Sequence, residues 1–519
     1  MTENQGSVHL GWGAALPHFQ QLDVSCMTGK ISVPEFYAGK KIFVTGVTGL
    51  MGKVLVEKLL RCCPDVDSVY CLIRTRKNRD AQQRISELTD SKLFDELRKV
   101  QPNFRQKILP ISGDVMLPDF GMSESERHMI EEGVHIIFHG AASIRFDEEL
   151  RVSVDMNVVG VQKMIKLCRN CKHLEALVHV STAYANCDHT HIEETVYTPS
   201  VEPQKVIDTL QWVDDETVEF LRRKLVKNKP NTYTYTKHLA EWVLLTEGAG
   251  LPIAIVRPSI VGATWKEPFP GWIDKFTGPS GMAVAIGKGL LRALKGDKNV
   301  VADLIPNDIP INIMITAAWY TAVVKPQKLM VYHAVTSPFN PVTWGQLQTG
   351  VLEAVKKTPM EGCFRLPVGP LIANRVIGRE PRMLKIYSKL HQATDDLAFF
   401  IKNSWTWATD NLQALRCQLT PHDQKVFYFD PRGIDWMKYM EIYCLGTKIF
   451  LLKEDLARVP AAHAHIRRLR IIHYLVRALL ILLFWHAVIR RSRTAHCLWS
   501  LVISFLMKLG QKLHIIRSV

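Results

Sequence analysis

A phenol and an ammonium group lie four residues apart in the segment Tyr233-Thr-Tyr-Thr-Lys237. On a helix, this spacing places both side chains on one face. The charge of Lys237 is expected to favour the phenolate and so to lower the pKa of Tyr233 from its usual value of about 10. Tyr233 and Lys237 are therefore predicted to form an acid–base pair. The same spacing also occurs by chance on exposed helices, and Tyr235 is a competing phenol.

Two hydroxyl groups, those of Ser181 and Thr182, come at the end of an apolar run over residues 174–181. Ligands of parallel sheets bind beyond the carboxyl ends of the strands, and a hydroxyl there can hydrogen-bond a carbonyl that is being reduced. Thr182 is the favoured helper group for Tyr233, and Ser181 remains the alternative.

Three glycines with the spacing G-x-x-G-x-x-G lie between another apolar run and a helical pattern. Gly46 permits a tight turn, Gly49 lets backbone N–H groups approach a pyrophosphate, and Gly52 permits close packing of helix on strand. The start of the helix adds the positive end of its dipole. The predicted nucleotide-binding residues of this loop are Thr45, Gly46, Thr48, Gly49, Leu50, Met51 and Gly52.

Cations follow the second apolar run, at Arg74, Arg76 and Lys77. Sites for NAD often carry an acidic residue about 20 residues after the glycines, where it binds the ribose hydroxyls. Cations at this place suit the 2′-phosphate of NADPH instead. Arg74 and Arg76 therefore predict NADPH, although a solvated loop would have the same composition.

Small and acidic residues follow the next two apolar runs. Asp114 and Val115 end the third, where a carboxylate can accept a hydrogen bond from an adenine amino group. Gly140 and Ala141 end the fourth, where small side chains let a cofactor lie close to the strand. All four residues are predicted to contact the nucleotide.

Short apolar runs alternate with helical patterns through the first half of the chain. Runs of this kind form parallel strands joined by right-handed crossovers, and such strands are buried on both faces. We therefore predict an α/β fold with a Rossmann-type, doubly wound parallel sheet. The predicted strands are residues 41–45, 68–74, 107–113, 135–141, 174–181 and 253–257.

The 519 residues are too many for one small core, since domains usually have roughly 100–200 residues. We expect an N-terminal tail over residues 1–39, ending in a short ordered segment, and a Rossmann-type catalytic domain over 40–370. A smaller, mainly helical domain rich in aromatic residues should follow over 371–460. A membrane-associated segment is expected over 466–519.

The C-terminal segment is apolar and basic. The runs 478–489 and 497–507 are each shorter than the roughly 20 residues that span a bilayer. Adding residues 471–475 extends the first run far enough if Arg477 snorkels. Basic residues flank the run, which favours a membrane, either as a spanning anchor or as a hairpin that dips in. A buried core helix is the alternative interpretation.

The net charge of +15 suits a polyanionic partner. No zinc finger, basic heptad helix or RNA-binding aromatic motif is present, so nucleic acid is not expected. The 11 cysteines form no disulfide framework, and Cys168-x-x-Cys171 has no second pair with which to bind a metal. The catalytic body is expected to face the reducing cytosol.

The order of these motifs resembles the extended short-chain dehydrogenase/reductase family, as does the turn Arg257-Pro258-Ser-Ile-Val-Gly262. Longer stretches are similar to the fatty acyl-CoA reductases, also called male-sterility-domain proteins. The resemblance extends from about residue 33 to the end of the chain. It includes residues 33–46, 53–61, 180–186 and 301–306, and also Trp405, Asn411, Asp430, residues 436–439 and residues 451–454.

This resemblance implies NADPH, a long-chain fatty acyl-CoA substrate, two successive reductions to a primary alcohol and a membrane-associated C-terminus. It implies Tyr233 and Lys237 as the catalytic pair, with Thr182 or Ser181 as helper, and Pro258 beside the cofactor. The helical domain would help to shape an acyl tunnel. Leu50-Met51 stands where the family usually has Phe-Leu; both pairs are apolar and should pack under the loop.

Two other functions share parts of this pattern. A membrane-bound sterol or sugar-nucleotide dehydrogenase or epimerase would have the same cofactor loop and Tyr/Lys pair but would need no thioester. A non-catalytic scaffold that binds lipid or NADPH would have no use for the tyrosine and lysine. The expected compartment is the endoplasmic reticulum or the peroxisome, and Arg517-Ser-Val519 is not a peroxisomal S-K-L tail. The sequence does not indicate an acyl chain length or an oligomeric state.

Overall fold

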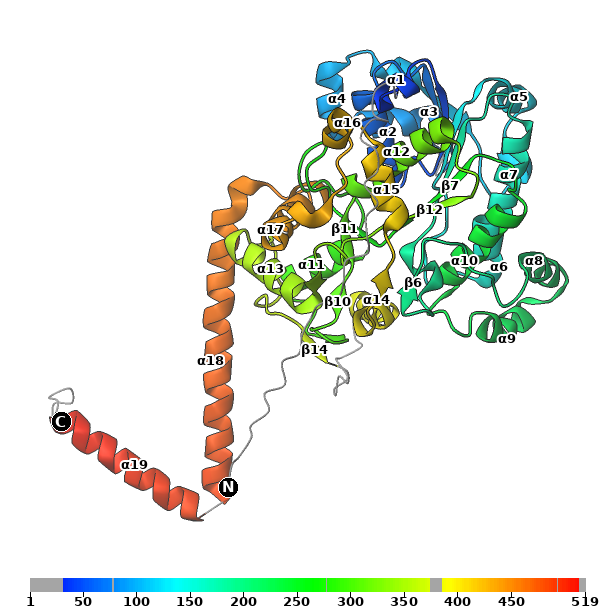
Figure 1. The fold of residues 1–519 in the computed structure, drawn as a ribbon. Helices are drawn as coiled ribbons and strands as arrows, with labels where there is room; N and C mark the ends of the chain where they lie inside the picture. Colours follow the sequence, from blue (N-terminus) through cyan, green and yellow to red (C-terminus); the bar gives the residue numbers. More distant parts are fainter. Residues whose placement is uncertain (1–30, 77–78, 277, 374–384, 492, 513–519) are drawn as a thin grey trace, which may run out of the picture.

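A seven-stranded parallel sheet forms the centre of the protein (Figure 1). The computed structural model describes residues 31–76, 79–276, 278–373, 385–491 and 493–512. Across the sheet the order is β12-β7-β5-β4-β1-β2-β3, and every neighbouring pair is parallel. The strands are β1 (Lys41–Thr45), β2 (Ser68–Ile73), β3 (Ile108–Ser112), β4 (Ile136–His139), β5 (Ala176–Val180), β7 (Ile253–Pro258) and β12 (Met330–Ala334).

Each of the six predicted runs matches one of these strands to within two residues at either end, which confirms the doubly wound α/β class. The seventh strand, β12, was not predicted. His333 interrupts its short apolar run, and the strand forms because it pairs with β7, about 75 residues earlier in the chain.

Helices cover both faces of the sheet. On one face lie α2 (Leu50–Cys62) and α12 (Asp308–Val324), and on the other lie α5 (Glu124–Gly133), α7 (Gly160–Asn170) and α10 (Thr232–Thr246). Within β1, Ile42 and Val44 join the first core and Phe43 joins the second. This alternation is what a strand buried on both faces requires.

Strand β1 lies between β4 and β2, so the order of the strands along the chain reverses beside it. The connection that follows β1 leads to β2 on one side, and the connection that follows β4 leads to β5 on the other side. Because the two connections diverge, a crevice opens beyond the carboxyl ends of β1 and β4. Ligands of open α/β sheets bind at such a switch point. The fold therefore places the glycine loop, which follows β1, at the head of this crevice.

Shorter elements surround the sheet. The helices are α3 (Ala81–Thr89), α4 (Asp95–Val100), α6 (Leu150–Val154), α8 (Pro203–Trp212), α9 (Asp215–Leu225), α11 (Pro279–Gly287) and α13 (Trp344–Lys357). Two-stranded ladders join β6 (His191–Ile192) to β15 (Thr406–Trp407), β8 (Ile260–Gly262) to β11 (Leu304–Pro306), β9 (Ala293–Lys295) to β14 (Leu371–Ala373), and β10 (Val301–Ala302) to β13 (Val342–Thr343).

The segment after β14 is mainly helical and packs directly on the sheet domain. Its helices are α14 (Lys385–Lys402), α15 (Asp410–Gln418), α16 (Pro421–Val426) and α17 (Trp436–Gly446). Leu412, Leu415 and Tyr443 belong to the same buried cluster as the residues of β1. The hydroxyl of Tyr439 donates to the carbonyl of Ala263 at 2.7 Å. The limits of 371–460 as a domain remain a prediction.

The predicted N-terminal tail ends in helix α1 (Val33–Tyr37), which belongs to the folded body. Ser32 and Glu35 form a capping box at its start. The hydroxyl of Tyr37 donates to the carbonyl of Ile315 at 2.9 Å, and the indole of Trp319 donates to the carbonyl of Ile31 at 3.0 Å. These bonds fasten the end of the tail to α12.

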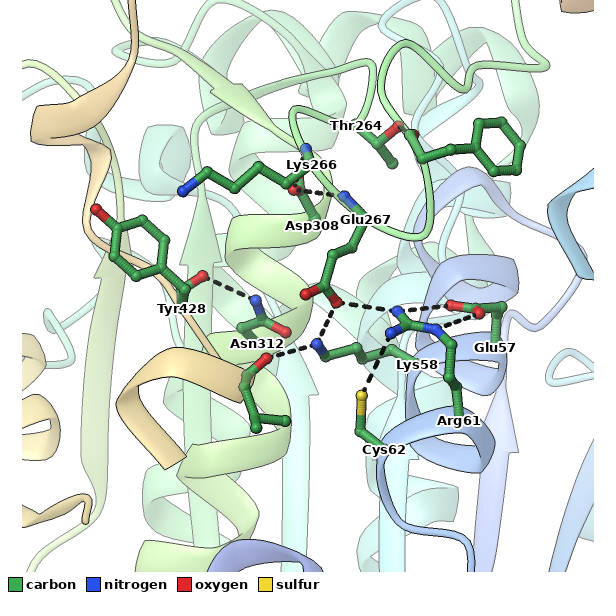
Figure 2. Close-up of polar contacts among 12 residues, drawn as sticks. Glu57, Lys58, Arg61, Cys62, Thr264, Lys266, Glu267, Asp308, Asn312 and Tyr428 are labelled. Carbon is green, nitrogen blue, oxygen red and sulfur yellow. Dashed lines mark hydrogen bonds and ion pairs between the residues drawn. The ribbon is translucent and has the colours of Figure 1, made fainter. Parts of the chain in front are cut away.

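Charged side chains tie the end of α2 to the loop that follows β8 (Figure 2). Glu267 of this loop pairs with the buried Lys58 and, at 2.9 Å, with Arg61, which also pairs with Glu57 at 2.7 Å. At the start of α12, the carboxylate of Asp308 accepts the backbone N–H of Lys266 at 2.8 Å. Charged groups buried in this way need such partners. The ion pairs hold α2, the helix that begins at the glycine loop, against the loop that follows β8.

Two C-terminal helices, α18 (Val459–Arg491) and α19 (Arg493–Lys512), extend beyond the body (Figure 1). The helical stretch Leu456–Arg491 is long and apolar enough to cross a membrane, and its apolar window is not buried in the protein. A buried core helix is therefore excluded for this segment. The indoles of Trp485 and Trp499 meet edge to face at 5.8 Å, where α19 turns back from α18.

Candidate active site

A cavity of about 840 Å³ lies at the carboxyl edge of the sheet, where the switch point predicts a ligand. Every residue that the sequence predicts for the site lines this cavity, with the exception of Arg76. These lining residues are Thr45, Gly46, Thr48, Gly49, Leu50, Met51, Gly52, Arg74, Asp114, Val115, Gly140, Ala141, Ser181, Thr182, Tyr233, Lys237 and Pro258. The fold thus brings together groups from six different strand ends and two helices.

The glycine loop has the backbone geometry that a dinucleotide needs. Gly46 has a φ of +78°, and a Cβ there would lie 2.7 Å from the carbonyl carbon of Gly140. A Cβ on Gly52 would lie 2.7 Å from the Cα of Val47. Gly49 is the N-cap of α2 and has no side chain to fill the approach to the helix start. The free N–H groups of this first turn form an anion site that suits a pyrophosphate.

Cations gather at the end of the cavity nearest β2. Arg74 lies 3.6 Å from Asp114, which follows β3. Arg84 of α3 and Lys275 also line the cavity, and neither was predicted from the sequence. Burial lowers the pKa of both groups, and neighbouring cations including Arg76 lower it further. Such a concentration of like charge favours a bound anion.

Arg76 is the exception among the predicted residues. It is exposed, its backbone forms a bridge with Arg79, and it does not line the cavity. Arg84 lies there instead and donates to the backbone carbonyl of Arg74. The sequence does not indicate that Arg84, rather than Arg76, lines the cavity. The position of Arg84 depends on how α3 packs against the end of β2.

Helix α10 carries the predicted acid–base pair into the cavity. The side chain of Asn231 caps the helix by accepting the N–H of Thr234 at 2.9 Å. Tyr233 and Lys237 then lie on the face that lines the cavity, whereas Tyr235 belongs to the hydrophobic core between α10 and the sheet. The competing phenol therefore points away from the site.

The electrostatics of Tyr233 differ from the prediction. Burial raises its pKa to about 12, a hydrogen bond with Thr182 offsets only part of this rise, and Lys237 makes no contribution. The expected lowering by Lys237 is therefore wrong for this arrangement. The ammonium group of Lys237 donates to the carbonyl of Val180 at 2.7 Å, and burial lowers its own pKa to about 8. At pH 7 Tyr233 is thus a phenol and Lys237 is mainly a cation.

Ser181 and Thr182 have different environments. The hydroxyl of Ser181 donates to Glu241 at 2.6 Å, so it is already engaged in a buried network. Thr182 caps the short helix that follows, since its hydroxyl accepts the N–H of Tyr184 at 3.3 Å, and it also bonds with Tyr233. Thr182 is the hydroxyl that shares a hydrogen bond with the phenol.

A buried ion pair lies behind the carboxyl end of β5, which Ser181 and Thr182 follow. Arg257 of β7 and Glu241 of α10 are both fully buried and form two hydrogen bonds, of 2.8 and 2.7 Å. The guanidinium also donates to the carbonyls of Glu193 and Thr195 at 3.0 and 2.6 Å. The arginine of the R-P-x-x-V-G turn therefore has a structural place behind the cavity wall rather than in it.

The other end of the cavity is apolar and aromatic. Phe146, Tyr184, Leu397 and Phe400 line it, and the last two belong to α14. The ring of Phe146 lies 6.1 Å from that of Tyr233 and 5.6 Å from that of Phe400. A flexible apolar ligand could lie along this wall with its polar end at Tyr233. None of these four residues was predicted individually, because α14 is about 150 residues from α10 in the sequence.

No group of three His, Cys, Asp or Glu side chains that could hold a metal ion occurs among the residues described. The cavity lining includes a phenol, a hydroxyl and an ammonium group beside the glycine loop.

Comparisons with known proteins agree with this arrangement. A family model for male sterility proteins, of the NAD-binding type, matches residues 44–314, and a second male sterility protein model matches residues 371–454. Fatty acyl-CoA reductase 1 of Homo sapiens is 45% identical, over 92% of this chain and 97% of the human protein. Fatty acyl-CoA reductase 2 of Bos taurus is 43% identical over the same shares.

The chain belongs to the fatty acyl-CoA reductase family.

Solved structures support the fold of this family member. The reductase domain of a nonribosomal peptide synthetase from Mycobacterium tuberculosis has a TM-score of 0.53 and 18% identity, covering 82% of this chain and 95% of that domain. The terminal reductase domain of the myxalamid pathway has a TM-score of 0.51 and 17% identity, covering 80% of this chain and 93% of the domain.

In this fatty acyl-CoA reductase family member, the first family match contains the glycine loop, Thr182, Tyr233 and Lys237. Leu397 and Phe400 lie in the second. The cavity therefore takes its nucleotide end and its acid–base groups from one matched region and part of its apolar wall from the other. The nucleotide end accommodates a nicotinamide cofactor.

Proposed function

We propose that this protein uses NADPH to reduce a long-chain fatty acyl-CoA to a primary alcohol through an aldehyde, releasing coenzyme A. The supporting observation is one cavity with a glycine cradle at one end, an aromatic wall at the other, and the hydroxyls of Thr182 and Tyr233 between them. The fatty acyl-CoA reductases named above are the relatives that point to the thioester substrate.

The residues of this chain would supply positioning and acid–base chemistry. NADPH, when bound, supplies the hydride for each reduction. Tyr233, a neutral phenol at pH 7, donates a hydrogen bond and then a proton to the oxyanion that forms at the thioester carbonyl, and Thr182 shares the charge. Lys237 lines the same cavity with its ammonium group bonded to the Val180 carbonyl, and it would place a positive charge beside the bound nucleotide.

Two successive reductions convert the thioester into the alcohol. Addition of hydride and a proton to the thioester forms a hemithioacetal. Its collapse breaks the C–S bond, and coenzyme A leaves as its thiol while an aldehyde remains. A second hydride and a second proton convert the aldehyde into the alcohol, so two NADPH are oxidised for each alcohol formed.

Preference for NADPH rests on the cationic end of the cavity. We expect Arg84→Gln to weaken NADPH binding about tenfold and leave NADH binding unchanged, because a charge-assisted hydrogen bond contributes about 1.5–3 kcal/mol. Fluorescence titration of both nucleotides measures this. Arg79→Gln is the matched control, since Arg79 pairs with Glu87 and does not line the cavity. Equal weakening of NADH would contradict the assignment.

The wall formed by α14 should influence acyl chain selection. We expect Phe400→Ala to raise the ratio of kcat/KM for a longer over a shorter saturated acyl-CoA about tenfold, because each additional buried methylene contributes about 0.8 kcal/mol. Phe399→Ala is the control, since Phe399 packs on Trp405 and does not line the cavity. An unchanged ratio in Phe400→Ala would show that the acyl chain lies elsewhere.

The candidate spanning helix supports an anchor that holds the catalytic body at the cytosolic face of the endoplasmic reticulum or the peroxisome. The charge distribution agrees with this: residues 456–519 contain 11 of the 65 Lys and Arg residues and no Asp or Glu, so they carry +11 of the net charge of +15. Most of the basic excess therefore belongs to the proposed membrane segment rather than to the body.

The direct test uses the purified full chain with NADPH and a C16 or C18 acyl-CoA. Two NADPH consumed and one coenzyme A released for each alcohol would support the proposal. Accumulation of aldehyde would limit the enzyme to one step. Oxidation of a sterol or a sugar nucleotide without release of coenzyme A would favour the alternative dehydrogenase function. Binding of both ligands without turnover would favour a scaffold.

A further inference from the structure

Helix α18 loses its contacts with the folded body where its apolar part begins. Residues 462–466 are buried or half-buried, whereas every residue from Arg470 to Trp485 is exposed. His463 bonds with the carbonyl of Lys357 at 3.2 Å, and His465 bonds with the carbonyl of Cys363 at 2.9 Å. His465 precedes Ile471 by six residues, which is roughly 9 Å along a helix axis.

The loop that receives His465 exposes two large apolar side chains. Phe364 is 65% exposed and Val368 is 45% exposed. Single exposed apolar residues are common on protein surfaces. These two differ because they lie on the loop that α18 contacts, beside the start of its apolar run.

Hydrogen bonds hold the backbone of this loop at Cys363 and Phe364, so the exposed side chain of Phe364 extends from an ordered backbone. The N–H of Phe364 donates to the carbonyl of Lys288 at 3.0 Å. The thiol of Cys363 donates to the carbonyls of Gly287 and Met360 at 3.2 and 3.1 Å. The loop is thus held between the end of α11 and the base of α18.

The charges around the loop suit an anionic surface. Arg365, Arg467, Arg468 and Arg470 are exposed. Among the nearby acidic groups, Glu361 pairs with Arg458 at 3.5 Å and Glu454 pairs with Lys288 at 2.7 Å, while Asp455 accepts the backbone N–H of Ala457 at 2.9 Å. An aromatic residue flanked by arginines is the composition that binds the interface of an anionic bilayer.

We propose that the loop around Phe364 and Val368 is a second membrane contact, which inserts both side chains into the interfacial region of the leaflet that α18 enters. This inference rests on the proposed anchor. With α18 alone, the body could swing about one helix. A second contact would fix the orientation of the body relative to the bilayer surface.

The test is depth-dependent quenching of a fluorophore in the full-length protein. Cys26, Cys417 and Cys497 are replaced by serine, and one cysteine is introduced and labelled by Phe364→Cys, Val100→Cys or Leu482→Cys. Val100 is the matched control, because it is 62% exposed on α4 (Asp95–Val100), which lies at the opposite end of the body (Figure 1). Leu482 reports on α18. Acyl-CoA reduction by each labelled protein shows that it is folded.

The proteins are placed in nanodiscs of phosphatidylcholine and phosphatidylserine that contain a phosphatidylcholine spin-labelled near its headgroup, which reports on positions 364 and 100, or deep in its acyl chain, which reports on position 482. We expect the label at 364 to be quenched at least about threefold more strongly than the label at 100, as insertion to interfacial depth requires. Equal quenching at 364 and 100 with strong quenching at 482 would overturn the second contact and leave the anchor intact. No quenching at 482 would refute the anchor itself.

A protein partner would give a different result. If a second copy of the chain covered Phe364, the fluorescence would shift to the blue without quenching by the spin-labelled lipid, and the shift would depend on protein concentration. That outcome would also overturn the proposal. As a second measurement, the double variant Phe364→Asp, Val368→Asp should reduce cross-linking of the body to a photoactivatable lipid about tenfold, while the control double variant Val100→Asp, Met129→Asp should not.

Discussion

Replacing Tyr233 with phenylalanine is expected to reduce turnover of acyl-CoA about 10³-fold, because the variant can neither hydrogen-bond the oxyanion nor protonate it. Affinity for NADPH should stay within about twofold of the original, since the ring remains and the glycine cradle is unchanged. Single-turnover assays with acyl-CoA and, separately, with a long-chain aldehyde would show whether both reductions depend on the same phenol.

Tyr235→Phe is the matched control for this prediction. Tyr235 lies two residues further along α10, but its ring is buried in the core, and its hydroxyl has no hydrogen-bond partner among the residues described. Removing this hydroxyl should leave turnover within about twofold. If Tyr235→Phe abolished turnover and Tyr233→Phe did not, the assignment of the acid–base group would be reversed.

Replacing Glu241 with alanine is expected to lower the free energy of unfolding by about 3–5 kcal/mol, because it leaves the fully buried guanidinium of Arg257 without its carboxylate. It also removes the acceptor of the Ser181 hydroxyl, one residue before Thr182. The measurement is the unfolding midpoint of the purified full chain in detergent. Turnover should fall as well, because the strand end that carries Thr182 loses its support.

Two further variants keep this prediction testable if Glu241→Ala does not fold. Glu241→Gln retains hydrogen-bonding groups but loses the charge, so its destabilisation should be smaller and the protein should remain measurable. Glu87→Gln removes a carboxylate from an exposed pair with Arg79 and should leave the midpoint unchanged. A midpoint in Glu241→Gln equal to that of the original protein would contradict the structural role of the pair.

The structural features that depend on residues close together in the chain could be predicted from the sequence. The glycine spacing determines where the chain turns after β1, and apolar runs determine which segments become parallel strands. The four-residue spacing of Tyr233 and Lys237 determines that both face the same way on α10. Strand β12 is the exception in the sheet, since the short run that forms it is interrupted by His333 and is stabilised by pairing with β7.

The environment of each group depended on tertiary structure. The pKa of Tyr233 rises because the fold buries the ring beside Phe146, and Lys237 binds the Val180 carbonyl instead of acting on the phenol. The distinct contacts of Ser181 and Thr182 arise because Glu241 and Tyr233 approach the same strand end from α10.

For this protein the amino-acid sequence by itself determined the parallel sheet, the nucleotide loop and the residues available for acid–base chemistry. Tertiary structure alone decided that Arg84 rather than Arg76 lines the cationic end, that α14 supplies the apolar wall, and that α18 leaves the body unburied. The physical reason is that periodicity and spacing act through local backbone geometry. Burial, charge and hydrogen bonding at a site depend on segments that meet only after the chain has folded.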